Sequence, residues 1–111
     1  MNLFEELQQK IKELEISVKQ LRKSGTDYAQ AERDYKILLR QECLKLRDEG
    51  MAIGMIDKTC YGLKTVADAR FNRDVKKTIY EANIEAIQSI KLQMRLIEGQ
   101  LNREWNTNLN D

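Results

Sequence analysis

The segment GMAIGMIDKTCYG, residues 50–62, gathers residue types that could react or adapt to a ligand: two of the four methionines, one of the two cysteines and three of the five glycines. Its glycines lack the GxxxxGK[ST] or GxGxxG spacing, so a phosphate-binding loop is not indicated. Methionines repack against varied partners, so the segment could be a docking surface. The alternative is structural, with these residues folded over the open end of a helical hairpin. The candidate partner surface comprises Met51, Met55, Ile56, Tyr61 and Trp105.

The remaining reactive groups do not form a catalytic set. The sequence has no histidine, which removes the commonest acid–base group at neutral pH and the commonest metal ligand. Cys43 and Cys60 lack CxxC spacing and are expected to be reduced thiols. A carboxylate metal site in a helical bundle uses Glu-x-x-His pairs, and a cysteine nucleophile usually needs a histidine base. We therefore predict no enzyme, no metal site and no cofactor.

Arginine is the second residue type with a regular spacing. Arg33, Arg40 and Arg47 recur every seven residues and would share one face of a helix. In an antiparallel hairpin this face would approach further basic residues on the second helix and could follow a phosphate backbone. The candidate basic patch comprises Arg40, Arg47, Arg70, Arg73 and Lys77. Because Asp68 and Asp74 are interleaved and the net charge is only +1, pairing with carboxylates is favoured over direct binding of nucleic acid.

The elements that must position these residues are two long helices. Charged residues make up 33% of the 111 residues, and the absence of proline permits long helices. Apolar residues recurring at steps of three and four predict one helix over about 2–49, capped by Asn2 and ended by Gly50, and a second over about 65–105. A short helical or loop connector over 50–64 joins them, and the polar tail 106–111 is expected to be disordered. Gly25 leaves open whether the first helix is continuous or breaks at residues 24–26.

Two helices of similar length with a short connection are antiparallel neighbours. The predicted fold is all-α: a single domain, 1–111, forming a long antiparallel, coiled-coil-like helical hairpin. The second helix carries an additional apolar row, and a wide apolar face needs more than one neighbour. We therefore expect self-association, most simply as a dimeric four-helix bundle. The predicted oligomer face comprises Tyr80, Ile84, Ile87 and Met94.

Two stretches, LRDEG and GLKTVADARFNRDVKKTIYEANIEAIQSIKLQMR, give the chain a resemblance to a family of short, all-helical phage and prophage proteins of Gram-positive bacteria. The residues that carry the resemblance are Arg47, Gly50, Val66, Ala67, Arg70, Arg73, Asp74, Tyr80, Glu81 and Ala82. The resemblance implies a phage origin and an early, non-virion role. It carries no known chemistry to individual residues.

Three functions are compatible with these features. The first is a non-enzymatic adaptor in phage DNA recombination or replication, because genes of the resembling family tend to lie among genes for those processes. The second is an inhibitor that binds a host protein such as a defence component, and the third is a virion structural or assembly-chaperone protein. The expected partners are a second copy of the chain and a phage or host protein.

No window approaches the roughly 18 apolar residues that span a membrane, and the N-terminus is not a signal peptide. We therefore expect a cytoplasmic protein of the host bacterial cell.

Overall fold

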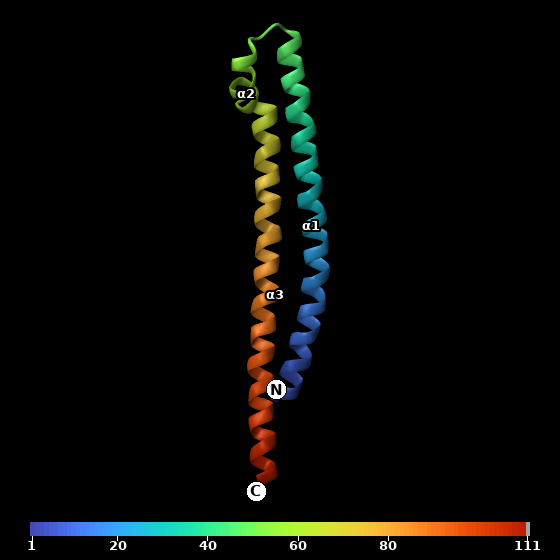
Figure 1. The fold of residues 1–111 in the computed structure, drawn as a ribbon. Helices are drawn as coiled ribbons and strands as arrows, with labels where there is room; N and C mark the ends of the chain where they lie inside the picture. Colours follow the sequence, from blue (N-terminus) through green and yellow to red (C-terminus); the bar gives the residue numbers. More distant parts are fainter. Residues whose placement is uncertain (111) are drawn as a thin grey trace. The chain divides into compact units, whose positions relative to one another are not determined.

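The computed structural model describes residues 1–110, with side chains through residue 108. Three helices follow one another along the chain: α1 (Leu3–Asp48), the short α2 (Ile53–Tyr61) and α3 (Lys64–Asn110) (Figure 1). No strand occurs within residues 1–110. Two compact units divide the chain: a central unit, Ser24–Tyr80, and a terminal unit, Met1–Lys23 with Glu81–Asp111.

Side-chain contacts establish that α1 and α3 run antiparallel. In the central unit the Tyr28 and Tyr80 rings lie 6.0 Å apart, and the Arg73 guanidinium carbon lies 4.5 Å from the centre of the Tyr35 ring. Residues later in α1 therefore contact residues earlier in α3. These contacts and the helical content confirm the predicted all-α hairpin.

Both ends of α1 follow local sequence signals. The Glu5 N–H donates a hydrogen bond of 2.8 Å to Oδ1 of Asn2, which confirms Asn2 as the N-cap. At the other end Gly50 has a φ of +87°, a conformation that strains other residues. The N–H groups of Gly50 and Met51 donate to the carbonyls of Arg47 and Leu46 at 3.0 and 3.1 Å, as in a Schellman motif. The glycine thus ends α1 and turns the chain toward α2.

Gly25 does not interrupt α1, which is continuous through residues 24–26. A Cβ built on Gly25 would lie 3.2 Å from Cε2 of Tyr80, closer than ordinary van der Waals contact. The glycine therefore makes room for the tyrosine ring. Packing of that ring offsets the weak helix propensity of glycine, which costs about 1 kcal/mol relative to alanine.

Buried and half-buried positions on both long helices recur with the seven-residue spacing of a coiled coil. On α3 the clearest series is Val66, Arg73, Tyr80, Ile87, Met94 and Leu101. On α1 it is Leu7, Leu14, Leu21, Tyr28, Tyr35 and Glu42. Several members are polar or aromatic, so the contact between the helices is more than an aliphatic seam.

The connector 50–64, predicted to be a short helical or loop segment, contains α2, which occupies nine of its residues. The structure changes one predicted boundary. The tail predicted to be disordered over 106–111 is helical over 106–110, and Asp111 lies outside the described residues. No glycine or proline follows Gly99, so nothing in the sequence breaks the last turns of α3.

Candidate functional site

A small buried cluster in the central unit holds all three helices together. Tyr35 of α1, Cys60 of α2 and Val66 of α3 form it, and the last two are completely buried. The partly buried side chains packed against the cluster are Leu39, Cys43, Leu46, Leu63 and Ala69. The cluster fixes α2 on the two long helices, so the residues around α2 are held on a defined frame.

The predicted partner surface divides into a buried part and an exposed part. Ile56 is buried, with 8% of its surface exposed, so it belongs to the packing and its assignment to a docking surface is wrong. Met51 is half-buried, whereas Met55 and Tyr61 are exposed. Trp105 is also exposed but belongs to the terminal unit. The connector therefore contains both packed and exposed residues, and its role as a docking surface stays a prediction.

Arg70 is tied to the end of α2. Its Nη1 donates a 3.1 Å hydrogen bond to the carbonyl of Tyr61, one of the last carbonyls of that helix. Its guanidinium carbon also lies 3.7 Å from the centre of the Tyr61 ring, a cation–π contact. Such a contact contributes about 0.5–1 kcal/mol at an exposed site. Arg70 therefore joins α2 to α3.

Arg73 is tied to α1 in a similar way. It covers the ring of Tyr35, and its Nη2 lies 2.9 Å from Oδ1 of Asp74. Burial by itself lowers the pKa of Arg73, but the hydrogen bond and negative charge of Asp74 outweigh it and raise that pKa above its ordinary value. The guanidinium is therefore positively charged where it covers the ring.

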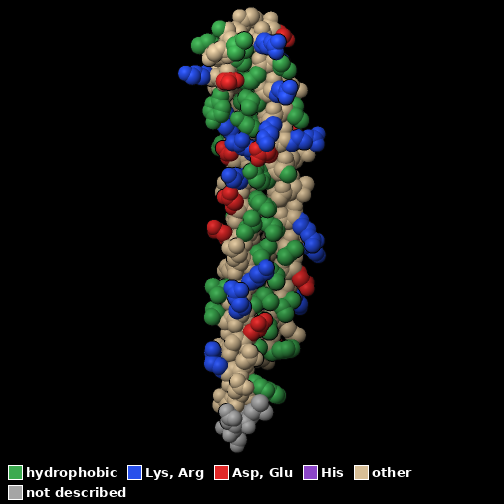
Figure 2. All heavy atoms as spheres, viewed as in Figure 1, with side chains coloured by type: hydrophobic (Ala, Val, Ile, Leu, Met, Phe, Trp, Pro, Cys, Tyr) green, Lys and Arg blue, Asp and Glu red, His purple; other side chains and the backbone are tan. Residues whose placement is uncertain are grey.

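Two members of the predicted basic patch, Arg70 and Arg73, make the contacts described above. The side chains of Arg40, Arg47 and Lys77 are exposed. The expected pairing of Arg73 with Asp74 is present, but Asp68 accepts the ammonium group of Lys64 at 2.8 Å. The stacking of arginines on Tyr35 and Tyr61 was missed from the sequence. Basic and acidic side chains are interspersed on the face shown in Figure 2.

Part of the predicted oligomer face of α3 packs within the chain, so the assignment is wrong for those residues. Ile87 is buried, with 7% exposed, and Tyr80 packs on Tyr28 and Gly25. Ile84 and Met94 are half-buried. Two apolar rows run side by side on α3, and periodicity alone does not tell which row faces the neighbouring helix.

A second apolar row on α3, beside Tyr80 and Ile87, is exposed in the central unit. Phe71, Val75 and Ile79, here named the outer row, lie one helical turn apart with exposed fractions of 70%, 38% and 46%. In the same unit α1 exposes Ile37 and Leu44, but these are seven residues apart. The outer row is therefore the more continuous apolar feature of the central unit.

The two cysteines meet although they are distant in sequence. Cys60 donates from Sγ to the carbonyl of Leu39, one turn before Cys43 on α1, at 3.4 Å. Burial, followed by a side-chain hydrogen bond with Cys43, raises the pKa of the Cys60 thiol to about 11. Both thiols are free, and Cys43 is only half-buried.

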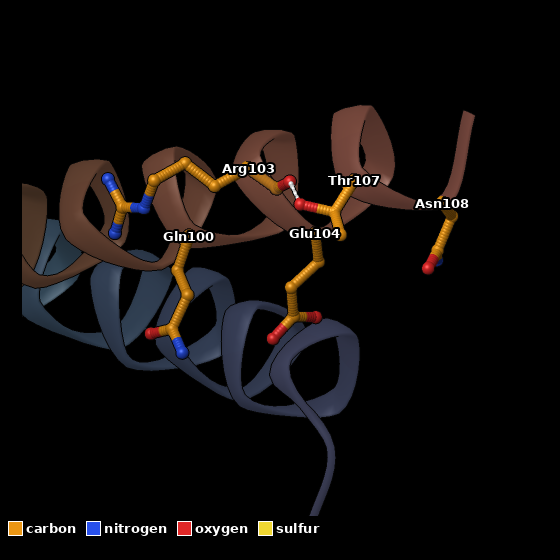
Figure 3. A pocket seen from close by; sticks show the side chains of 5 residues that line it. All are labelled: Gln100, Arg103, Glu104, Thr107 and Asn108. Atoms are coloured by element: carbon orange, nitrogen blue, oxygen red, sulfur yellow. Dashed lines mark hydrogen bonds between the residues drawn. The ribbon is translucent and has the colours of Figure 1, made fainter. Parts of the chain in front are cut away.

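A groove on α3 is lined by Gln100, Arg103, Glu104, Thr107 and Asn108 (Figure 3). All five side chains come from the last turns of this one helix, and the Thr107 hydroxyl donates to the Arg103 carbonyl at 2.9 Å.

Among the described residues there is no group of three or more potential metal ligands. None of the described helices is long and apolar enough to cross a membrane.

Known proteins offer no independent guide to these surfaces. No family model matches the chain, and neither a curated protein nor a solved structure is significantly similar to it. The resemblance to phage and prophage proteins therefore stays a prediction, and function has to be argued from the outer row, the exposed residues of α2 and the polar contacts that position them.

Proposed function

We propose that the protein is a non-enzymatic protein-interaction module whose first partner is a second copy of the same chain. The observation that carries this proposal is the outer row: Phe71, Val75 and Ile79 expose 70%, 38% and 46% of their surfaces on successive turns of α3.

The outer row is the surface that we assign to the second copy. Its three apolar side chains are spaced so that they project from one side of α3, which is the pattern of a helix–helix contact. Contiguous exposed apolar surface marks interaction sites in soluble proteins. Most homodimers are two-fold symmetric, so the row of one copy would pack against the same row of the other. The expected assembly is a four-helix dimer.

Association can be tested by light scattering on the purified protein. We expect wild type to be a dimer and the double variant Val75→Glu/Ile79→Glu to be a monomer of unchanged helicity, because buried unpaired carboxylates are costly. Ile37→Glu is the matched control: Ile37 and Ile79 are both 46% exposed, on different helices of the same unit. A monomeric wild type, or dissociation by the control alone, would contradict the proposal.

The cellular role that we propose is an adaptor in phage DNA recombination or replication. Its support is the resemblance of residues 46–50 and 62–95 to phage and prophage proteins, together with a net charge of +1, which favours protein partners over nucleic acid. The test is an affinity pull-down of the tagged protein from infected cells. Recovery of a phage nuclease or annealing protein is expected. Recovery of a host defence protein, or of a capsid or tail protein, would replace the adaptor role by one of the alternatives.

A further inference from the structure

We propose that Cys43 and Cys60 form a thiol modification site, which a low-molecular-weight disulfide oxidises to an intramolecular disulfide between α1 and α2. This inference is independent of the proposed function. It concerns a covalent state of the central unit, and it holds or fails whether or not the chain dimerises.

Two contacts and one electrostatic effect place the two thiols near each other. Cys43 packs against the buried cluster that contains Cys60. The Sγ of Cys60 lies 3.4 Å from the carbonyl of Leu39, so its side chain is directed at the turn of α1 that precedes Cys43. The Cys43 thiol is also close enough to influence the Cys60 thiol through a side-chain hydrogen bond. The proposed sulfur–sulfur bond, which requires Cβ atoms about 3.5–4.5 Å apart, would form at this contact between α1 and α2.

The two thiols differ in access, which sets the order of reaction. Cys60 is completely buried, and the pKa of its thiol is raised to about 11. Because the thiolate is the nucleophile, Cys60 is a poor first site for any reagent in solution. Cys43 is half-buried and faces solvent in part. Cys43 is thus the attacking thiol and Cys60 the resolving thiol.

The chemistry proceeds in two exchange steps. The Cys43 thiol loses its proton to solvent, and its sulfur attacks one sulfur of the small disulfide, whose other half leaves as a thiolate. The Cys60 thiol then loses its proton and attacks Sγ of Cys43 in the mixed disulfide, which releases the second half as a thiolate. The two cysteines are oxidised by two electrons in total, and one small disulfide is reduced to two thiols.

The bond would add a covalent link to a helix that the buried cluster and Arg70 already hold on α1 and α3. The N-terminal residue of α2 is capped by Ala52, which has no side-chain hydrogen bond to offer. The buried residues of α2 are Ile56 and Cys60. A link from Cys60 to α1 would anchor the exposed residues Met55 and Tyr61 of α2, and it would constrain the unfolded chain.

The disulfide reagent dithiobis(nitrobenzoate) provides the test, because each half that leaves is a coloured thiolate. Wild type should release two equivalents and retain no label, and its mass should fall by two hydrogens. Tryptic digestion without reductant should then join peptide 41–45 to peptide 59–64. The second release should quicken by about tenfold per pH unit below the pKa of Cys60, because the thiolate fraction grows by that factor.

Single variants separate the two roles. Cys60→Ser should release one equivalent and keep the label on Cys43, whereas Cys43→Ser should react at least about tenfold more slowly than wild type because Cys60 is buried. The peptide linkage in wild type decides the proposal even if a variant does not fold. Two retained labels on wild type, one label with no second release, or disulfide-linked pairs of chains in a non-reducing gel would each overturn it.

Discussion

The central and terminal units use the same two long helices but are held together differently. Among the described residues, five of the six buried hydrophobic side chains belong to the central unit, and Ile87 alone belongs to the terminal unit. The central unit adds two arginine–aromatic contacts and the third helix. Both units expose apolar side chains: the terminal unit exposes Phe4, Ile16 and Leu96, and the central unit exposes the outer row. Helix formation is therefore common to both units, whereas tight packing is concentrated near the chain reversal.

This difference predicts different opening free energies for the two units. Regions with few buried apolar contacts open first in native-state exchange. All four tyrosines lie in the central unit, whereas Trp105 lies in the terminal unit. Spectroscopic signals from tyrosine therefore report on the central unit, and substitutions in each unit can be followed by a probe already present in the chain.

The largest loss of stability should come from an unpaired charge placed in the buried cluster. Val66→Asp should lower the free energy of unfolding by about 4 kcal/mol or more, because Val66 is completely buried. The near-ultraviolet circular dichroism of the tyrosines should be lost with it. Ile87→Asp, the matched change in the terminal unit, should leave most of that tyrosine signal in place. Loss of the tyrosine signal in both variants would show that the units unfold together.

Gly25→Ala should lower the free energy of unfolding by about 1 kcal/mol. Helix propensity alone would predict the opposite, because alanine in a helix is more favourable than glycine by about 1 kcal/mol. The loss is expected because the new Cβ would meet the Tyr80 ring at 3.2 Å. In a Tyr80→Ala background the same change should stabilise by about 1 kcal/mol, and urea titrations of the four proteins give the coupling energy. An unchanged sign in the two backgrounds would contradict the close-packing explanation.

Arg73→Lys should cost about 0.5–1 kcal/mol, since lysine keeps the charge but loses the planar group that covers Tyr35 and contacts Asp74. Arg40→Lys, at an exposed position of α1, should change the free energy of unfolding by less than about 0.5 kcal/mol. Thermal melts of both variants provide the comparison. Equal melting temperatures would show that the arginine–tyrosine contact adds nothing to the central unit.

The smallest change in stability at neutral pH is expected from the titration of the Cys60 thiol. Its folded-state pKa of about 11 lies above the ordinary value of 9.0, so the folded state holds the thiol proton more tightly than the unfolded state. The stability linked to that proton is fully present below pH 9 and is lost as pH rises toward 11. Denaturation of the reduced protein across this range should show a steeper alkaline decline for wild type than for Cys60→Ala. Parallel curves would contradict the raised pKa.

The sequence predicted the features of the fold that depend on local pattern. Asn2 as an N-cap, Gly50 as the end of α1 and the helical period of both long helices are properties of short segments, and the structure confirms them. Which apolar row of α3 faces α1 depends on the other helix, so Ile87 was assigned to the wrong face. The partners of Arg70 and the meeting of the two cysteines likewise depend on where α2 packs, which no periodicity encodes.

The seven-residue spacing of the buried positions limits how this chain can change in length. Deleting one residue within α3 would rotate every later side chain by about 100° about the helix axis, and would carry Ile87 and Met94 away from the face that they share with Val66. Inserting seven residues would nearly restore that face, since two helical turns take about 7.2 residues. Viable length variants should therefore differ by whole heptads, gained or lost together in α1 and α3.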